Sequence, residues 1–270
     1  MTEGFFQTSS IRLHGARAGT GPLVIYLHGI TANWAVWKPI LERMAAQTTG
    51  VAISQRGHGQ SDKPEGDYGS HGFVLDTFAL IERLNLGPAI IVGHSLGARN
   101  GVVAGATRPD LVRGVLSVDF VPQIERSALE TLKDRVIKGD RSFDTLDDAK
   151  AYLADRYKLI PPDAIARRAE NGFVQVDDKW KPRASASAMA KTADGLFEDY
   201  HDAYRNIQVP TIAIRGAKST LTSAEAFAKA TALRPDIEHL TVEDVDHYVP
   251  EENPEVIMSH LRRLIDAATR

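Results

Sequence analysis

Residues 89–97 read Ala89-Ile90-Ile91-Val92-Gly93-His94-Ser95-Leu96-Gly97, and this stretch decides the fold. Four apolar residues suit a short buried strand, and a helical pattern follows the serine up to Thr107. The glycines on either side of Ser95 allow a sharp turn and a close approach of the helix to the sheet. Ser95 would then project at the head of a helix, where unpaired N–H groups favour a developing negative charge. The stretch predicts a nucleophilic serine, with the N–H of Leu96 as one oxyanion donor.

Further segments of the chain show the same buried-strand pattern and alternate with helical stretches. The additional strands are expected at Leu23–Leu27, Val51–Ile53, Gly114–Val118, Pro210–Ile214 and Glu238–Val242, the last being polar enough for an edge. Helices are expected at Trp37–Ala46, Val74–Leu84 and Leu96–Thr107. Strands that alternate with helices imply an α/β fold with a mostly parallel, doubly wound sheet covered on both faces.

The alternation stops between about Phe120 and Asn206, where the chain is rich in charges and helical patterns. Ligands of open parallel sheets bind along the carboxyl ends of the strands, and an insertion at that edge would roof the site. We therefore expect a core made of residues 1–119 and 207–270, with a helical lid formed by residues 120–206.

Composition excludes several classes of function. The chain has 270 residues, of which 43% are hydrophobic and 25% charged, and its formal net charge is −3. Such a chain has no overall basic field that would indicate a nucleic-acid or acidic-membrane partner. The absence of cysteine excludes disulfides and thiolate catalysis. Residues 1–21 lack the apolar core of a signal peptide, so a cytoplasmic protein is expected, and the sequence leaves its oligomeric state open.

A second turn is expected at the same sheet edge as Ser95. His28-Gly29-Ile30 follows the strand Leu23–Leu27. In folds with such a serine turn, this loop supplies the second oxyanion donor, which would be the N–H of Ile30. Its other interpretation is an ordinary glycine turn at the end of a strand. No metal or organic cofactor is expected, because the histidines at 28, 58 and 94 lack metal-ligand spacing with nearby carboxylates.

The motifs together resemble the α/β-hydrolases. They are His28-Gly29, Arg56-Gly57-His58-Gly59-Gln60-Ser61-Asp62, Gly93-His94-Ser95-Leu96-Gly97 and Asp246-His247-Tyr248-Val249-Pro250, in this order. The resemblance covers essentially the whole chain outside the lid, and it implies a Ser–His–Asp hydrolase in which His247 is the base. One departure is Gln55, where the family often has Asp. We expect this change to affect local structure rather than chemistry.

The acid of the site is not where the family usually keeps it. Most members carry it after the seventh strand, in a Gly-x-x-Asp pattern or one residue later, but here the segment 216–220 contains no carboxylate. A histidine without its carboxylate loses the correct tautomer and the partner of its cation. Asp119 ends the neighbouring strand run and is the expected substitute, although it could instead cap the start of the lid. Asp244 and Asp246 are the alternatives.

Two arginines of the lid lie on otherwise apolar helix faces. Arg156 shares a face with Leu146, Ala149, Leu153 and Ile160 in a helix expected around residues 146–160. Arg135 flanks a stripe formed by Leu129, Leu132 and Val136. A guanidinium in such a place needs an anionic partner, which is either a structural carboxylate or a carboxylate of the substrate. The sequence leaves both interpretations open.

Within the family, the acid at Asp119 and the lid side chains resemble amidohydrolases of vitamin B6 degradation. This resemblance implies hydrolysis of an enamide with two carboxylates to acetate, ammonia, carbon dioxide and succinic semialdehyde. It also implies that a small dicarboxylate is held by Arg135, Arg156, Tyr157, Trp180 and Tyr248. Trp180 and Tyr248 could equally be packing residues.

Several alternatives remain open from the sequence. Ser95 could attack the acetyl carbon, or His247 could activate a water that does so. The same fold also carries esterases and carbon–carbon bond hydrolases, because a fold does not determine function. A ligand receptor on a hydrolase scaffold, which binds without turnover, is the alternative of another class.

Overall fold

The computed structural model describes residues 1–268 and contains one large sheet of eight strands in the order β1-β2-β4-β3-β5-β6-β9-β10. The six strands from β4 to β10 in this order are parallel, whereas β1 and β2 pair antiparallel at one side. The strands are β1 (Thr2–Gln7), β2 (Arg12–Ala18), β3 (Leu23–Leu27), β4 (Thr49–Ile53), β5 (Ala89–His94), β6 (Val112–Val118), β9 (Thr211–Gly216) and β10 (Glu238–Val242).

The six parallel strands confirm the strand runs expected from the sequence. β3 and β10 have the expected bounds, and β10 lies at the edge of the sheet. The β1–β2 hairpin was not predicted. β1 alternates between exposed and half-buried residues, and its register comes only from pairing with β2. A strand of this kind lacks the continuous apolar run that marks a strand buried on both faces.

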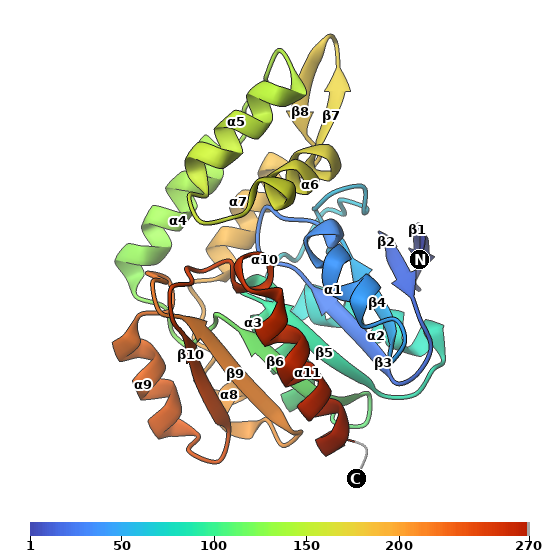
Figure 1. Ribbon diagram of the computed structural model, residues 1–270, viewed down its shortest axis with the longest axis vertical. Coiled ribbons are helices and arrows are strands. Elements are labelled where there is room, and N and C mark those ends of the chain that lie inside the picture. Colours follow the sequence, from blue (N-terminus) through green and yellow to red (C-terminus); the bar gives the residue numbers. More distant parts are fainter. Residues whose placement is uncertain (269–270) are drawn as a thin grey trace.

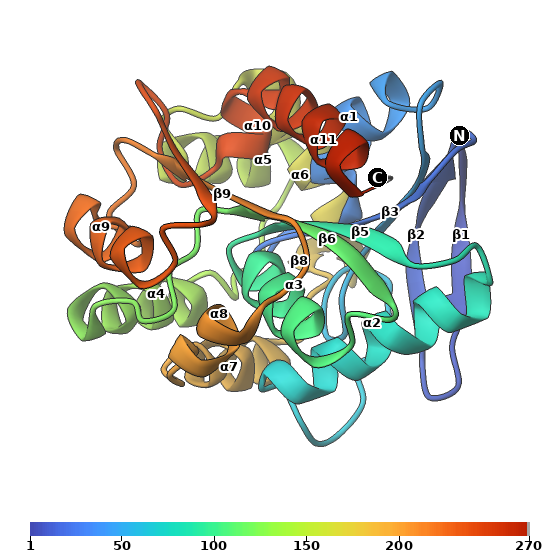
Figure 2. The ribbon, with the colours of Figure 1, turned by 90° about the horizontal axis from the view of Figure 1, so that it is seen from below.

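Helices cover both faces of the sheet, as expected for an α/β fold. Figure 2 shows α1 and α11 on one side of the sheet and α2, α3 and α8 on the other. The core helices are η1 (Trp34–Trp37), α1 (Lys38–Arg43), α2 (Ser70–Leu84), α3 (Leu96–Thr107), α8 (His201–Asn206), α9 (Ala224–Leu233), α10 (Val249–Glu252) and α11 (Pro254–Ala268). The expected helix Trp37–Ala46 is therefore a 3-10 turn followed by a short α-helix.

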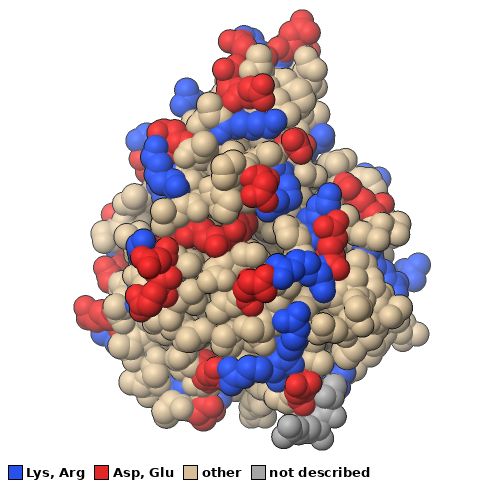
Figure 3. Space-filling view, in the orientation of Figure 1, with Lys and Arg blue, Asp and Glu red and all other residues tan. Residues whose placement is uncertain are grey.

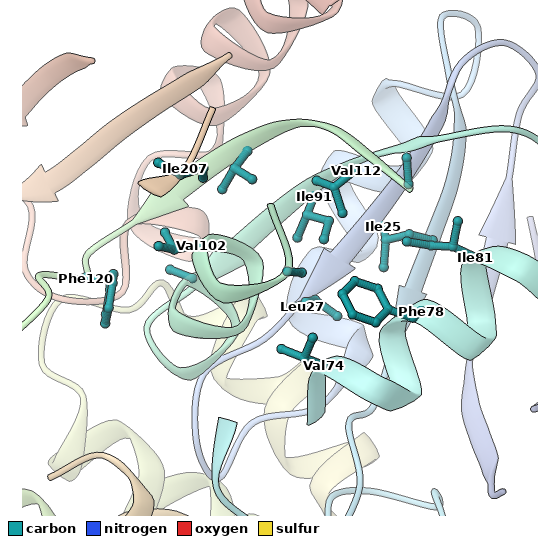
Figure 4. Close-up of a cluster of buried hydrophobic side chains, with 14 of the residues drawn as sticks. Ile25, Leu27, Val74, Phe78, Ile81, Ile91, Val102, Val112, Phe120 and Ile207 are labelled. Atoms are coloured by element: carbon teal, nitrogen blue, oxygen red, sulfur yellow. The ribbon is translucent and has the colours of Figure 1, made fainter. Parts of the chain in front are cut away.

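Apolar side chains fill the space between each helical layer and the sheet. In Figure 4, Ile25, Leu27 and Ile91 of the strands face Val74 and Phe78 of α2. A second cluster lies on the opposite face, between the sheet and the helices α1 and α11. Successive residues of a strand point to opposite faces, so strands buried on both sides read as continuous apolar runs.

The chain order makes a crevice at the carboxyl ends of β3 and β5. From β3 the sequence continues to β4 on one side, while β5 pairs with β3 on the other side. Ligands of such sheets bind at the point where the strand order reverses. The loop after β3 and the Ser95 turn after β5 lie together there, because Leu27 pairs with Gly93 at the ends of the two strands.

The segment between β6 and β9 forms helices and one hairpin above this crevice (Figure 1). Its elements are α4 (Arg126–Lys138), α5 (Leu146–Arg156), α6 (Pro162–Gly172), β7 (Phe173–Val176), β8 (Lys179–Pro182) and α7 (Ala186–Gly195), followed by α8. The helix expected around residues 146–160 ends at Arg156, and Ile160 lies in the connection to α6. α8 packs against α3, so the end of the insertion joins the core layer.

Charges are spread evenly over the surface shown in Figure 3, where acidic and basic side chains are interspersed. This distribution matches the small net charge of −3. Within residues 1–268, no helix has both the length and the apolar composition needed to cross a membrane.

Candidate active site

Ser95 occupies a strained turn between β5 and α3. Its φ is +53°, in a region that non-glycine residues seldom adopt, and such strain gathers at functional sites. A Cβ atom on Gly93 would lie 2.2 Å from the carbonyl oxygen of Gly97, and one on Gly97 would lie 2.1 Å from that of Leu27. Both glycines are therefore required. The N–H of Ser95 donates to the carbonyl of Val118 at 2.8 Å, which ties the turn to β6.

The imidazole of His247 meets the carboxylate of Asp119 across the sheet edge. Asp119 directly follows β6, and His247 lies in the loop after β10. Nδ1 of His247 is hydrogen-bonded to Oδ2 of Asp119, whose side chain is fully buried. A carboxylate only accepts hydrogen bonds, so Nδ1 carries the proton and Nε2 is left free to act as a base. This geometry is the one that a Ser–His–Asp site requires.

The two alternative acids do not meet the imidazole. Asp244 is largely exposed and pairs with Lys218 at 3.1 Å. Asp246 contributes its backbone N–H to Glu252. Within residues 1–268 neither carboxylate is hydrogen-bonded to His247, whereas Asp119 is. Closeness along the chain places these groups beside the loop rather than at Nδ1.

A serine stands where the family usually keeps its acid. Ser219 donates its hydroxyl to Oδ2 of Asp119 at 2.6 Å, and the N–H of Gly216 donates to Oδ1 at 3.1 Å. These donors from the loop after β9 hold both oxygens of the displaced carboxylate. Sequence reasoning did not single out Ser219, because the residue type alone does not reveal a partner 100 positions away.

His94 contacts the backbone of the loop that carries His247. Its Nε2 is 2.8 Å from the carbonyl oxygen of His247, so this nitrogen carries the proton and donates. Burial holds the pKa of His94 well below its usual value, with a further lowering by the neighbouring His247. A neutral His94 therefore packs beside the His247 ring, with 4.7 Å between ring centroids.

The expected oxyanion donors lie on either side of Ser95. Leu96 is the first residue of α3, and Ile30 lies in the loop after β3. No acceptor among the described residues takes the N–H of Ile30 or Leu96. No hydrogen bond joins Ser95 to His247 in the described part of the chain either, and such bonds often tighten only when substrate binds.

A small inner cavity adjoins this arrangement. It has a volume of about 10 Å³ and is bordered by His94 and His247 on the core side. Its insertion side includes three arginines and one tyrosine, namely Arg135, Arg156, Arg168 and Tyr157, and Tyr248 borders it from the loop that carries His247. No Asp or Glu of the described residues lines it. An outer cavity of about 80 Å³ shares Arg156, Tyr157 and Arg168 with it. The site therefore presents positive charge to a ligand.

Arg135 and Arg156, both singled out from the sequence, have no carboxylate partner in the described residues. Arg156 donates through Nη1 to the carbonyl of Arg135 at 3.0 Å and to the hydroxyl of Tyr152 at 2.8 Å. Its Nε is buried and has no partner within residues 1–268. The sequence left open whether the partner of each arginine is a structural carboxylate or a substrate carboxylate. Within the described residues, no structural carboxylate pairs with Arg135 or Arg156.

A third arginine was missed by sequence reasoning. Arg168 of α6 is buried and forms a two-pronged ion pair with the buried Glu251 of α10, with Nε 2.8 Å from Oε1. Its Cζ lies 4.8 Å from the ring centroid of Tyr157 and 5.0 Å from that of Tyr248. The sequence does carry an indication of this role, because Arg168 lies on the same apolar helix face as Ile165 and Ala169.

The two tyrosines respond differently to these charges. Burial alone would raise the pKa of Tyr157, but Arg156, Arg168 and Arg135 outweigh it and lower that pKa. Burial raises the pKa of Tyr248, and the nearby Tyr157 raises it further. Their rings meet edge to face with 4.8 Å between centroids. Both hydroxyl-bearing rings thus form one wall of the inner cavity beside His247.

Trp180 does not lie with the other residues expected to hold the dicarboxylate. It belongs to β8, and its backbone pairs with Phe143 in the hairpin region. Its side chain packs with the cluster of α5 and α6, and it lines neither the inner nor the outer cavity. The expectation of a substrate contact came from resemblance alone, and this placement favours the packing interpretation.

Comparison with known proteins bears on both family and fold. A family model described as "Alpha/beta hydrolase family" matches residues 24–259. The chain belongs to the alpha/beta hydrolase family. This hydrolase chain is 47% identical over 257 residues to a protein of Mesorhizobium japonicum named 2-(acetamidomethylene)succinate hydrolase, covering 95% of this chain and 92% of that protein.

Solved structures give the same result for the fold. The crystal structure of an E-2-(acetamidomethylene)succinate hydrolase matches this hydrolase with a TM-score of 0.96 and 45% identity, covering 98% of this chain and 99% of that one. An enol-lactonase from Burkholderia xenovorans LB400 matches with a TM-score of 0.74 at 17% identity, covering 97% and 100%, and shows the fold alone. The expected α/β-hydrolase fold with a mostly parallel sheet is confirmed.

The described residues also bear on metal binding. Within residues 1–268 no group of three or more His, Asp or Glu side chains is arranged to hold a metal ion.

Proposed function

We propose that this hydrolase cleaves the amide bond of (E)-2-(acetamidomethylene)succinate through Ser95, His247 and Asp119. The observation that carries the proposal is the inner cavity beside His247, where Arg135 and Arg156 face the site without a carboxylate partner among the described residues. Two guanidinium groups that lack a carboxylate partner match a substrate with two carboxylates. The relatives at 47% and 45% identity carry the name of this activity.

The proposed chemistry is acyl transfer to water. His247 takes a proton at Nε2, either from Ser95 as it attacks the acetyl carbon or from a water that attacks directly. The N–H groups of Ile30 and Leu96 stabilise the negative charge on the carbonyl oxygen. His247 then returns its proton to the leaving nitrogen, which departs as an enamine dicarboxylate. If Ser95 attacked, a water activated by His247 then releases the acetyl group from Ser95; by either route the products are acetate and the enamine dicarboxylate.

The later steps need little from the protein. Water adds to the enamine and releases ammonia, which leaves an aldehyde with a carboxylate on the adjacent carbon. This product loses carbon dioxide to give succinic semialdehyde. The proposed binding residues are Arg135, Arg156, Tyr157 and Tyr248, all of which line the inner cavity. The cytoplasmic location expected from the sequence stays a prediction.

The proposal is tested by replacing each free arginine. Arg135→Ala and Arg156→Ala should each raise KM for the dicarboxylate enamide by about 10-fold to 100-fold, the value of one charged hydrogen-bonded contact. Hydrolysis of the neutral ester p-nitrophenyl acetate, which has no carboxylate, should stay within about two-fold of the unmodified enzyme. Arg126→Ala is the matched control, because Arg126 lies on the same helix as Arg135 but is exposed.

Three outcomes would contradict the proposal. The unmodified enzyme could fail to release acetate from the enamide while it hydrolyses neutral esters, which would favour an esterase. Alternatively, both arginine variants could keep the KM of the unmodified enzyme for the enamide, which would remove the dicarboxylate contact. A fluorophosphonate probe that leaves Ser95 unlabelled would instead favour a receptor without turnover.

A further inference from the structure

A chain of buried hydrogen bonds runs from α3 to the loop after β3. Nε of Arg99 donates to Oδ1 of Asn100 at 3.0 Å, and Nδ2 of Asn100 donates to Oε1 of Gln55 at 2.7 Å. Nε2 of Gln55 then donates to the carbonyl oxygen of His28 at 2.7 Å. All four side chains are buried. The guanidinium is an obligate donor and the carbonyl an obligate acceptor, so the orientation of both amides is determined.

A separate hydrogen bond joins the backbone of Gln55 to the ring of His28. The backbone N–H of Gln55 points at Nε2 of His28 at 3.0 Å, so Nε2 must accept. Neutral imidazole then carries its proton on Nδ1, which donates to the carbonyl oxygen of Gly29 at 2.7 Å. Burial holds the pKa of His28 well below its usual value, which keeps the ring in this neutral form.

The carbonyl of Gly29, which accepts the hydrogen bond of the His28 ring, belongs to the peptide group that contains the oxyanion donor of Ile30. The carbonyl of Gly29 and the N–H of Ile30 are part of one planar unit and point in opposite directions. A hydrogen bond to the carbonyl therefore fixes the direction of the N–H and polarises it, as in other hydrogen-bond chains. This peptide lies against the nucleophile, because a Cβ atom on Gly29 would be 3.3 Å from Cβ of Ser95.

Arg99 gives the chain a positive end. Its other acceptors are the carbonyl of Gly195 at 3.2 Å and the hydroxyl of Tyr200 at 3.3 Å. No carboxylate of the described residues lies within ion-pair distance of it. Each side-chain donor in the series Arg99, Asn100 and Gln55 thus points towards the carbonyl oxygen of His28, where the series ends. The series therefore fixes the His28 main chain, which directly precedes the Gly29–Ile30 peptide.

We propose that Gln55 is a positioning residue that orients the Ile30 N–H, because its side chain and its backbone N–H together hold the main chain and the ring of His28. The inference rests on the proposed acyl transfer at Ser95. Glutamine suits this role because it accepts from Asn100 and donates to His28 at the same time. A glutamate at this place, with the same length as glutamine, would turn lone pairs towards the carbonyl of His28.

The test uses two substitutions of Gln55 and a probe that does not need a dicarboxylate. Gln55→Glu and Gln55→Met should both slow labelling of Ser95 by a fluorophosphonate, and lower kcat on the enamide, by about 10-fold to 100-fold at about pH 8. KM for the enamide should stay within about two-fold, because the arginine contacts are untouched. A purely structural role would change the melting temperature without this separation of kcat from KM.

The pH dependence separates the two variants. The carboxyl group that Gln55→Glu introduces can donate to His28 again once it is protonated. The labelling rate of this variant relative to the unmodified enzyme should therefore rise as the pH falls from about 8 to about 5.5. Gln55→Met has nothing to protonate, and its ratio should stay constant. Should one variant fail to fold, the other still tests the proposal through its rate.

The outcomes distinguish this inference from the proposed function. Folded Gln55 variants that label and turn over at the rate of the unmodified enzyme would overturn the role of Gln55, even if the enamide is the substrate. Slowed labelling in both variants supports that role, even if the unmodified enzyme does not cleave the enamide. The proposal is also contradicted if the labelling rate of Gln55→Glu relative to the unmodified enzyme does not change with pH and its kcat is unchanged.

Discussion

The carboxylate of Asp119 explains, at the scale of single residues, how an imidazole can be oriented without an acid in its usual place. Ser219 and Gly216 hold the carboxylate, and the carboxylate holds Nδ1 of His247. The φ of Asp119 is +53°, and its N–H donates to the carbonyl of Ile214 at 2.6 Å. Backbone and side chain are thus both anchored to the neighbouring strand β9, which leaves the carboxylate little freedom.

Removal of this negative charge gives the first residue-scale prediction. Asp119→Asn keeps the size of the side chain but lets it donate to His247, which favours the wrong tautomer. We expect kcat on the enamide to fall by about 10⁴-fold, as in other Ser–His–Asp sites, while KM changes little. Steady-state kinetics of the purified variant provide the measurement.

The matched control for this prediction is Asp244→Asn. Asp244 was an alternative acid from the sequence, but its side chain is exposed and pairs with Lys218. Its replacement should leave kcat within about two-fold of the unmodified enzyme, since exposed ion pairs contribute little. Equal losses in both variants would mean that Asp119 has no special role at the imidazole.

At the scale of elements, the predictable features were those carried by a continuous pattern. Apolar runs predicted the six parallel strands. The glycines around Ser95, with a strand before them and a helix after them, predicted the sharp turn. His247 and Asp119 were predictable because they follow strand runs that end at one edge of the sheet. The placement of Asp119 at the imidazole agrees with that expectation, while its catalytic role stays a prediction.

Other features depend on contacts between elements that are distant in sequence. The pair Arg168–Glu251 joins α6 to α10, and Ser219 reaches Asp119 from the loop after β9. In neither case does the sequence around one residue indicate which residue it will contact. Trp180 shows the opposite case, because the resemblance implied a ligand contact, whereas its side chain packs with the cluster of α5 and α6. The outcome depended on where the hairpin lies, which no local pattern encodes.

The Arg168–Glu251 pair provides the element-scale prediction, because it joins the insertion to the helix behind His247. Glu251→Gln leaves the guanidinium buried without its counter-charge. The free energy of unfolding should therefore fall by about 3–5 kcal/mol in urea titrations. The double variant Arg168→Met/Glu251→Leu removes both charges and should recover most of that loss, since an apolar pair of similar size is well tolerated in a protein interior.

Activity distinguishes a positioning role from a purely structural one. Arg168 lies against the rings of both Tyr157 and Tyr248, so the double variant should regain stability yet keep a reduced kcat on the enamide. Glu130→Gln, which breaks the exposed pair with Arg126, should change the free energy of unfolding by less than about 1 kcal/mol. Full activity of the stable double variant would show that the pair only holds the insertion in place.

At the scale of the whole molecule, three buried histidines link stability to pH. Burial lowers the pKa of His58 to about 4, and it holds the pKa values of His28 and His94 well below their usual range. Nε2 of His58 is buried with no partner in the described part of the chain, and its Nδ1 lies 2.9 Å from the carbonyl of Arg56. The folded protein therefore keeps these rings neutral.

The sign of the effect follows from proton binding. Below a pH of about 6.5 the unfolded chain protonates its histidines, whereas the folded protein does not protonate His58 until the pH approaches 4. The unfolded state thus binds more protons in this window, and the free energy of unfolding must fall as the pH falls. His58 alone accounts for about 3 kcal/mol between neutral pH and its folded pKa.

Urea unfolding at several pH values between about 7 and 4 checks this prediction. His58→Gln keeps a donor for the carbonyl of Arg56 but has no group to titrate, so its unfolding free energy should fall less steeply over the same window. His71→Gln replaces an exposed histidine and should retain the slope of the unmodified protein. If stability were instead flat down to about pH 4, the folded protein would have to accept protons at these rings, and the neutral His28 on which the orientation of the Ile30 amide depends would be lost with them.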